Sequence, residues 1–166
     1  MSKTKGIVML RKLLGLKPKA SIYSQAMPQT EGALELTYLG TAGFILKNKQ
    51  RTVVLDPYLS RIGVTELFRP LHTNTALLKK YIPHADDVLI GHAHYDHILD
   101  APDLCKQTGA RLIGSKATCM VGRAAGLPES QLKETEGRED IACGSWTVRG
   151  LPSIHGKAIF GRIPIP

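Results

Sequence analysis

Alternating and clustered apolar residues divide the chain from Leu34 onward into short segments. Leu34, Leu36 and Tyr38 alternate with polar neighbours, and short apolar runs follow at residues 44–46 and 53–55. A period of two is typical of β-strands, and the intervening glycine- and lysine-containing segments are typical of turns. The pattern therefore predicts an antiparallel meander of three strands.

The rest of the chain alternates between helix-like and strand-like segments. Helices are predicted at residues 74–81, from Asp100 as N-cap to about Gln107, and from Ser115 as N-cap to near Gly126. Strands are predicted at residues 88–90, 111–114, near Ile141 and at 146–151. The first of these is an unalternated aliphatic run, which is typical of a strand buried on both faces. Strands that alternate with helices indicate a layered α/β fold.

Length and charge set the domain organisation. The 166 residues suffice for one domain, and no apolar run is long enough to span a bilayer. Six of the eight net positive charges come from lysines and arginines before residue 20, which leaves +2 for residues 21–166. We interpret residues 1–32 as a basic flexible leader that could contact an anionic membrane surface weakly, and residues 33–166 as the domain. The near-neutral body argues against a nucleic-acid partner.

The cysteines indicate the compartment. The chain has three of them, Cys105, Cys119 and Cys143, which are widely spaced and form no CxxC pair. This spacing predicts neither a disulfide framework nor a cysteine metal site. We therefore expect inert thiols and a cytoplasmic, reducing environment.

Half of the six histidines lie in one stretch directly after the aliphatic run at 88–90. Residues i and i+2 of an extended segment project to the same side, so His92 and His94 should point together. Asp96 and His97 can reach the same place from the start of the next segment. Imidazoles and carboxylates are ligands of borderline divalent metals, so the stretch predicts a metal site, with zinc as the expected ion.

A complete site needs a third ligand from elsewhere in the chain. His155 is the best candidate because it lies in a tight polar turn, Pro152-Ser153-Ile154-His155-Gly156, directly after a predicted strand. The alternative is an ordinary turn histidine. His72 and His84 lie in proline-flanked loops, where we expect surface roles.

The stretch His92-Ala93-His94-Tyr95-Asp96-His97 resembles the HxHxDH signature of the metallo-β-lactamase superfamily. The segment at residues 36–44 is similar to the opening hairpin of that family, and residues 54–59, which contain Asp56-Pro57, are similar to its first motif. The DPYLS segment and the turn at His155 look most like the branch that contains ascorbate-phosphate lactonases and N-acylethanolamine-type phospholipases D.

The resemblance implies a four-layer αββα sandwich, of which this chain would form the N-terminal half. It also implies that His92, His94 and His155 hold a first zinc, that Asp96 and His97 hold a second, and that Asp56 orients a ligand. Asp96 is the implied catalytic residue, and the implied substrate is a small or lipid-like molecule. The alternative for Asp56 is a turn-capping aspartate before proline.

The chain departs from the family pattern after His155. The family implies a further aspartate that bridges both metals and a further histidine, but residues 156–166 contain no Asp, Glu, His or Cys. We therefore interpret the chain as a truncated copy or fragment that binds one zinc tightly and self-associates through a bare sheet face. The functional hypotheses are a hydrolase of esters, lactones or phosphodiesters, an inactive metal-binding fragment, and a nucleic-acid-processing member of the same superfamily.

Overall fold

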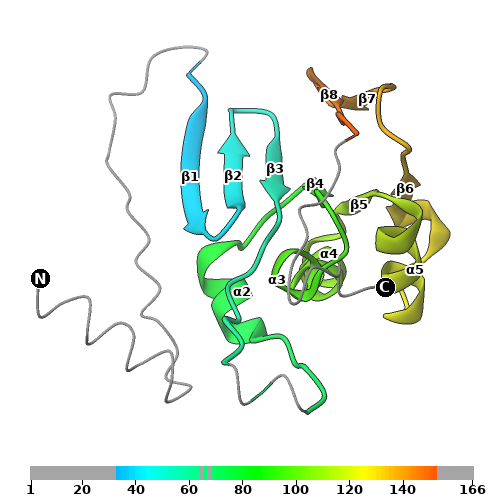
Figure 1. Ribbon diagram of the computed structural model, residues 1–166. Coiled ribbons are helices and arrows are strands. Elements are labelled where there is room, and N and C mark those ends of the chain that lie inside the picture. The colour runs from blue at the N-terminus through cyan, green and yellow to red at the C-terminus, as the bar shows by residue number, and fades with distance from the viewer. Residues whose placement is uncertain (1–32, 64–65, 67–68, 153–166) are drawn as a thin grey trace, which may run out of the picture.

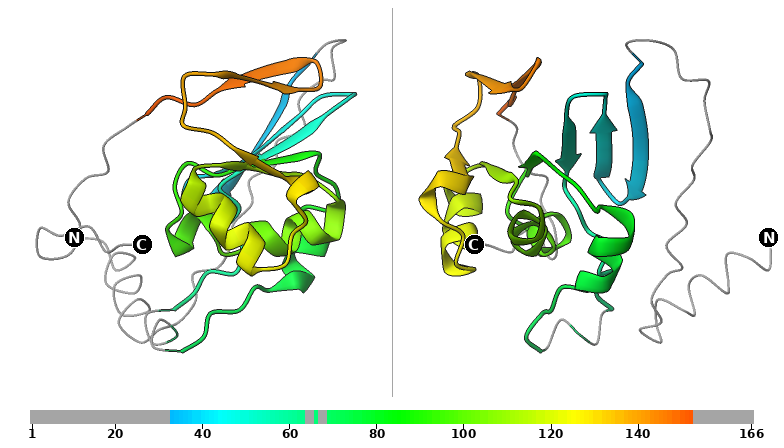
Figure 2. Two further views of the ribbon diagram at one scale, coloured as in Figure 1. Left: turned by 90° about the vertical axis from the view of Figure 1, so that its right-hand side faces the viewer. Right: turned by 180° about the vertical axis from the view of Figure 1, so that it is seen from behind.

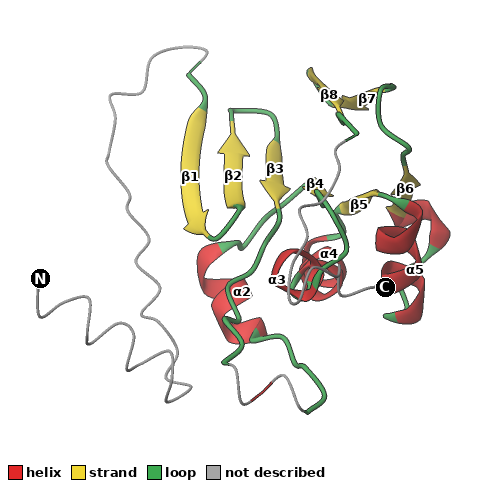
Figure 3. Ribbon diagram, viewed as in Figure 1, coloured by secondary structure: helices red, strands yellow, loops and turns green. Residues whose placement is uncertain are grey.

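The computed structural model of the chain describes residues 33–63, 66 and 69–152 (Figure 1). The predicted leader, residues 1–32, and the turn that contains His155 lie outside the described residues. Within the described part, strands and helices alternate as the sequence pattern predicts, so the α/β class is confirmed (Figure 3). None of the helices in the described part has the length and apolar character needed to cross a membrane.

A six-stranded sheet forms the centre of the molecule, and its strands lie side by side in chain order. The strands are β1 (Glu35–Gly40), β2 (Gly43–Lys47), β3 (Thr52–Leu55), β4 (Asp87–Leu89), β5 (Arg111–Gly114) and β6 (Leu132–Glu134). The first three strands pair antiparallel, which confirms the predicted meander. The pairs β3–β4, β4–β5 and β5–β6 are parallel, so the carboxyl ends of β3, β4 and β5 meet at one edge of the sheet.

Three helices of the described part begin and end close to where the sequence predicts, and a fourth, short helix was not predicted. They are α2 (Thr75–Tyr81), α3 (Tyr95–Ile98), α4 (Ala101–Thr108) and α5 (Lys116–Ala124). The Asn74 side chain caps α2 by accepting from the backbone N–H of Leu77, and the Ser115 side chain caps α5 in the same way. Gly109 ends α4 in the left-handed conformation, with φ of 76°. The single turn of α3 was not predicted as a helix.

The two faces of the sheet have different covers, and the strand register shows which residues belong to each. Ile45, Val54, Val88 and Leu112 are aligned on one face, which packs against the helices in the larger core. The opposite face carries Val53 and Ile113, which pack against a second, two-stranded sheet of β7 (Asp140–Cys143) and β8 (Trp146–Arg149). Figure 2 shows the helices on one side of the sheet and the β7–β8 hairpin on the other.

The second face is covered only in part. The hairpin packs on the part of this face that carries Val53 and Ile113. Leu36 and Tyr38 of β1 point to the same side but remain 61% and 43% exposed. Leu34, just before β1, is also exposed. The described residues thus leave an apolar strip at the β1 edge of the sheet.

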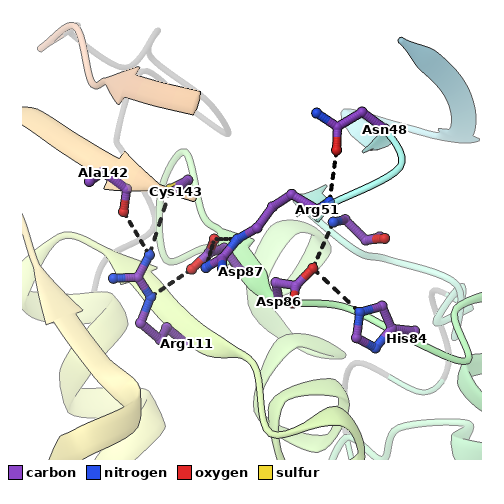
Figure 4. Close-up of polar contacts among 9 residues, drawn as sticks. Asn48, Arg51, His84, Asp86, Asp87, Arg111, Ala142 and Cys143 are labelled. Atoms are coloured by element: carbon purple, nitrogen blue, oxygen red, sulfur yellow. Dashed lines mark hydrogen bonds and ion pairs between the residues drawn. The ribbon is translucent and has the colours of Figure 1, made fainter. Parts of the chain in front are cut away.

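A fully buried carboxylate ties the hairpin to the main sheet at the start of β4 (Figure 4). Asp87 lies between two guanidinium groups, 2.6 Å from Nη2 of Arg51 and 2.7 Å from Nε of Arg111. Arg111 also donates a hydrogen bond to the carbonyl oxygen of Ala142 in β7 at 2.9 Å. One acidic side chain therefore links the loop before β3, strand β5 and the second sheet.

The three cysteines are buried, and none forms a disulfide. Burial raises the pKa of the Cys105 thiol to about 12 and also raises the pKa of Cys119 and Cys143. A thiol with a raised pKa contains little of the reactive thiolate at neutral pH. The thiols are therefore inert packing groups, as the sequence indicated.

Candidate metal centre

The histidine-rich stretch lies at the edge of the sheet where the parallel strands end. β3 ends at Leu55 and is followed by Asp56, and β4 ends at Leu89, shortly before His92. Because these strands are parallel neighbours, the two segments that follow them meet above the same edge. Ligands of open α/β sheets bind at the carboxyl ends of the strands, so this is the expected place for a site.

The structure brings His92 and His94 together, as their i, i+2 spacing predicts. Nε2 of His92 lies 3.0 Å from Nδ1 of His94, and the two ring centroids are 4.5 Å apart. The His97 ring lies against His92, with a centroid separation of 3.9 Å. Three imidazoles thus form one half-buried group, which we call the histidine cluster.

Asp56 holds His97 in place. Its Oδ2 lies 2.9 Å from Nδ1 of His97, and its Oδ1 accepts the backbone N–H of Gly91 at 2.7 Å. A carboxylate accepts hydrogen bonds, so Nδ1 of neutral His97 carries the proton and Nε2 keeps its lone pair. Asp56 is 9% exposed, and its φ of 40° lies in the left-handed region, so its backbone adopts an uncommon conformation.

Gly91 allows this close approach. A Cβ atom at position 91 would lie 3.1 Å from Oδ2 of Asp56, which is closer than ordinary van der Waals contact. The absence of a side chain between β4 and the histidine cluster therefore permits the Asp56 carboxylate to reach both the Gly91 amide and the His97 ring.

Asp96 and Tyr95 complete the rim of the cluster. Oδ2 of Asp96 lies 3.9 Å from Nε2 of His97, on the side of the ring that Asp56 does not occupy. Tyr95 is exposed and meets Tyr58 edge to face, with centroids 6.0 Å apart. Burial raises the pKa of Tyr58 to about 12 and also raises that of Tyr95, so both phenols stay neutral at physiological pH.

Asp100 has a role that sequence reasoning missed. It precedes α4 as predicted, but its side chain makes no cap bond to that helix. Instead Oδ2 accepts the backbone N–H groups of Leu59 and Ser60, at 2.6 and 2.8 Å, and Oδ1 accepts the Ser60 hydroxyl. This buried aspartate therefore fastens the loop that follows Asp56 to the segment that follows the histidine cluster. A local cap signal could not reveal partners 40 and 41 positions away.

The two remaining histidines of the described region, His72 and His84, take no part in the contacts given above for the histidine cluster. His84 is exposed and lies 3.4 Å from Asp86, at the start of β4, as a surface histidine would. His72 is also exposed, and it lines a cavity of about 590 Å³ that His94 and Asp96 line as well. The surface location predicted for both is confirmed, and the position of His72 beside the cavity was not predicted.

The donor set fits a zinc ion in its chemistry. Two nitrogens that bind the same tetrahedral zinc at 2.0–2.1 Å are separated by ~3.3 Å, close to the 3.0 Å between His92 and His94. No group of three or more His, Cys, Asp or Glu side chains within the described residues is arranged to hold a metal ion. The predicted third ligand, His155, lies outside them. The ligand roles of His92, His94, Asp96, His97 and His155 thus remain predictions.

Residues 51–163, more than half of the chain, match the family model described as the β-lactamase superfamily domain. The chain belongs to this superfamily. The match spans Asp56, the histidine cluster and His155, and it confirms the family that the HxHxDH pattern indicates.

Curated relatives from the superfamily carry a common name. The chain is 33% identical over 138 residues to a UPF0173 metal-dependent hydrolase of Thermodesulfovibrio yellowstonii. That alignment covers 77% of this chain and 48% of the relative. It is 34% identical over 130 residues to a UPF0173 metal-dependent hydrolase of Anaeromyxobacter sp. strain K. That alignment covers 76% of this chain and 44% of the relative. The chain therefore spans about half the length of these relatives. The finer branch suggested by the DPYLS segment stays a prediction.

A solved structure shows the same fold. CmlA from Streptomyces venezuelae, described as a diiron β-hydroxylase, aligns with a TM-score of 0.56 and 24% identity over 79% of this chain and 26% of that one. A helical layer, a mixed central sheet and the beginning of a second sheet are consistent with one half of the αββα sandwich of the superfamily. The predicted fold is thereby confirmed.

Proposed function

We propose that the chain contributes the metal-binding wall of a hydrolase active site, with zinc as the metal. The observation that carries the proposal is the approach of Nε2 of His92 to Nδ1 of His94 beside a third imidazole, His97, that a carboxylate orients. The curated relatives are named metal-dependent hydrolases, which supports the same reaction class.

The proposed roles follow from the hydrogen bonds. His92 and His94, with His155, would hold the first metal, and Asp96 with His97 would hold a second, more weakly. A bound zinc would supply Lewis acidity and a water with a pKa near 7. The hydrogen bond with Asp56 would keep the proton on Nδ1 of His97, so that Nε2 would be available to bind the second metal. Asp96, whose Oδ2 lies 3.9 Å from Nε2 of His97, would orient the attacking water.

The proposed substrates are small molecules with an ester, lactone or phosphodiester bond. We place the protein in the cytoplasm, in agreement with its three buried, reduced thiols. We do not assign a nucleic-acid partner, because residues 21–166 carry a net charge of only +2.

One observation favours a second candidate, metal binding without turnover. Within the described residues, no three side chains are arranged to complete a metal site. A cluster with too few ligands holds its ion loosely and leaves a bound water poorly oriented.

Hydrolysis assays distinguish the two candidates. The zinc-loaded 166-residue chain should release p-nitrophenol slowly from p-nitrophenyl acetate or bis-p-nitrophenyl phosphate, and a chelator should stop the release. His92→Ala serves as the blank, and His84→Ala, which changes a surface histidine, as the matched control. Turnover equal to the His92→Ala blank would contradict the hydrolase and favour the metal-binding candidate.

A further inference from the structure

The cavity beside the histidine cluster has the size of a small-molecule site. Its volume is about 590 Å³, within the range of ~300–1,000 Å³ that ligand pockets typically occupy. His94 and Asp96 form part of its wall, so a group bound there would lie directly beside the proposed reaction centre.

Much of the cavity wall is apolar. Ile98 of α3 and Val121 of α5 line the cavity, together with Leu71, Leu99 and Ala125. These residues come from three segments far apart in the chain, which the packing of α3 and α5 on the sheet brings around one space. Contact with such a wall stabilises a hydrocarbon group because it removes apolar surface from water.

Apart from His72 and His94, the ionisable side chains on the wall that carry charge at neutral pH are acidic. The two carboxylates among the lining residues are Asp96 and Asp103, and no lysine or arginine is among the lining residues that the structure describes. Lys106, which does not line the cavity, forms an ion pair with Asp103, with Nζ 3.5 Å from Oδ1. The pair is exposed, so it contributes little stabilisation. In the metal-free chain a negatively charged ligand group would meet these carboxylates, and no lysine or arginine of the described lining would offset its desolvation.

We propose that this cavity is a specificity pocket for an uncharged, apolar group of the substrate, and that it rejects carboxylate and phosphate groups. The inference rests on the proposed hydrolase function and narrows its substrates. A substrate would place a neutral aliphatic or aromatic group between α3 and α5, with the bond to be cleaved toward His94. An anionic part of the substrate would have to lie on another side of the site.

The test measures binding without catalysis or metal. Hexan-1-ol and hexanoate, which share a six-carbon skeleton but differ in charge, are titrated into the isotopically labelled 166-residue chain at pH 7 and followed by NMR. Hexan-1-ol should shift the amide signals of Ile98, Val121 and Ala125 saturably, and hexanoate should bind at least fivefold more weakly. Equal binding of the two, or shifts confined to β1, would overturn the proposal.

Two variants make the result specific. Ala125→Phe fills the cavity and should weaken hexan-1-ol binding at least tenfold, whereas Ala124→Phe, at an exposed position one residue earlier, should leave it unchanged. Asp103→Lys, at the partly exposed start of α4, keeps the cavity open and should raise hexanoate affinity at least fivefold. Unchanged binding in Ala125→Phe, or unchanged discrimination in Asp103→Lys, would contradict the pocket.

The same sample separates this inference from the proposed function. A chain that binds zinc but shows no preference for hexan-1-ol would refute the pocket and leave the hydrolase assignment intact. A chain that binds hexan-1-ol at Ala125 but no zinc would refute the hydrolase assignment, and the pocket would then be a binding site without it.

Discussion

Oδ2 of Asp56 and Nδ1 of His97 lie 2.9 Å apart, although 41 positions separate the two residues in the chain. The contact joins the end of β3 to the helical turn after β4, and it leaves Nε2 of His97 directed toward Asp96. In the proposed metal centre, Asp56 would orient a ligand without being a ligand itself.

Replacing Asp56 with asparagine should weaken the second metal site. The amide N–H group of Asn can donate to Nδ1 of His97, which would move the ring proton to Nε2 and block the nitrogen proposed to bind metal. We expect a loss of about 10- to 100-fold in affinity for the weaker metal. Cobalt titration followed by its visible spectrum measures the loss, and unchanged affinity would mean that Asp56 only caps the turn before Pro57.

Zinc stoichiometry tests the first site. We expect close to one tightly held zinc per chain, because three predicted ligands serve the first site and only Asp96 and His97 the second. Elemental analysis after chelator treatment and reloading measures it. His94→Ala should abolish tight binding, and His84→Ala should preserve it. Two tightly held ions would show that a further ligand is present.

The carboxylate of Asp87 should be a main determinant of stability. Asp87→Asn removes the charge between Arg51 and Arg111. We expect the free energy of unfolding to fall by about 2 kcal/mol or more. The loss should be smaller than that of breaking a fully buried ion pair, because both arginines are partly exposed. Asp140→Asn is the matched control, because its ion pair with Arg149 is exposed, and should cost much less. Urea unfolding followed by circular dichroism compares the two, and similar losses would contradict the prediction.

Asp100 should make stability depend on pH in the direction opposite to that of an ordinary paired aspartate. Burial raises the pKa of this carboxyl above the usual 3.8, although hydrogen bonds from Ser60 and Leu59 oppose the shift. The folded state then binds the proton more tightly than the unfolded state. The contribution of Asp100 is therefore complete below the unfolded pKa and is lost as the pH rises through the folded pKa.

Paired unfolding curves reveal this effect. The difference in unfolding free energy between the native chain and Asp100→Asn should shrink as the pH rises from about 4 to 7, because asparagine does not titrate. The other carboxyls contribute to both proteins and cancel in the difference. A difference that grows with pH would show that the hydrogen bonds outweigh burial.

The apolar strip at the β1 edge should cause self-association. Leu34, Leu36 and Tyr38 are exposed together, and contiguous exposed apolar surface favours contact between molecules. Light scattering should detect dimers or larger species, and Leu36→Asp should shift them toward monomer. Met120→Asp, at an exposed apolar residue on α5, is the control and should have little effect. A stable monomer at all concentrations would contradict the prediction.

The sequence predicted those elements whose formation depends on residues close together in the chain. The two-residue period located β1, the helical pattern at residues 74–81 located α2, and the cap at Ser115 located α5. The spacing of His92 and His94 predicted their approach. Each of these features depends on neighbours within a few positions. The superfamily resemblance added the link between Asp56 and the histidine cluster.

The elements that were missed depend on distant contacts. β6 carries the polar residues Lys133 and Glu134 and shows no apolar alternation, and it is a strand because it pairs with β5. Asp100 has the sequence signal of a helix cap, yet it bonds to Leu59 and Ser60. The cavity next to His94 forms where α3 and α5 pack on the sheet, so no single stretch of sequence contains its pattern.

The strict chain order of the six-stranded sheet has a consequence for assembly during synthesis. Each strand pairs with the strand made just before it, so a new segment always finds an available edge as the chain leaves the ribosome. The crossovers between the parallel strands contain helices, which form from local contacts. The β7–β8 hairpin is synthesised after these six strands, so the Arg111 that its Ala142 contacts can already be paired with Asp87. The sheet can therefore grow from β1 to β6 without waiting for a distant partner.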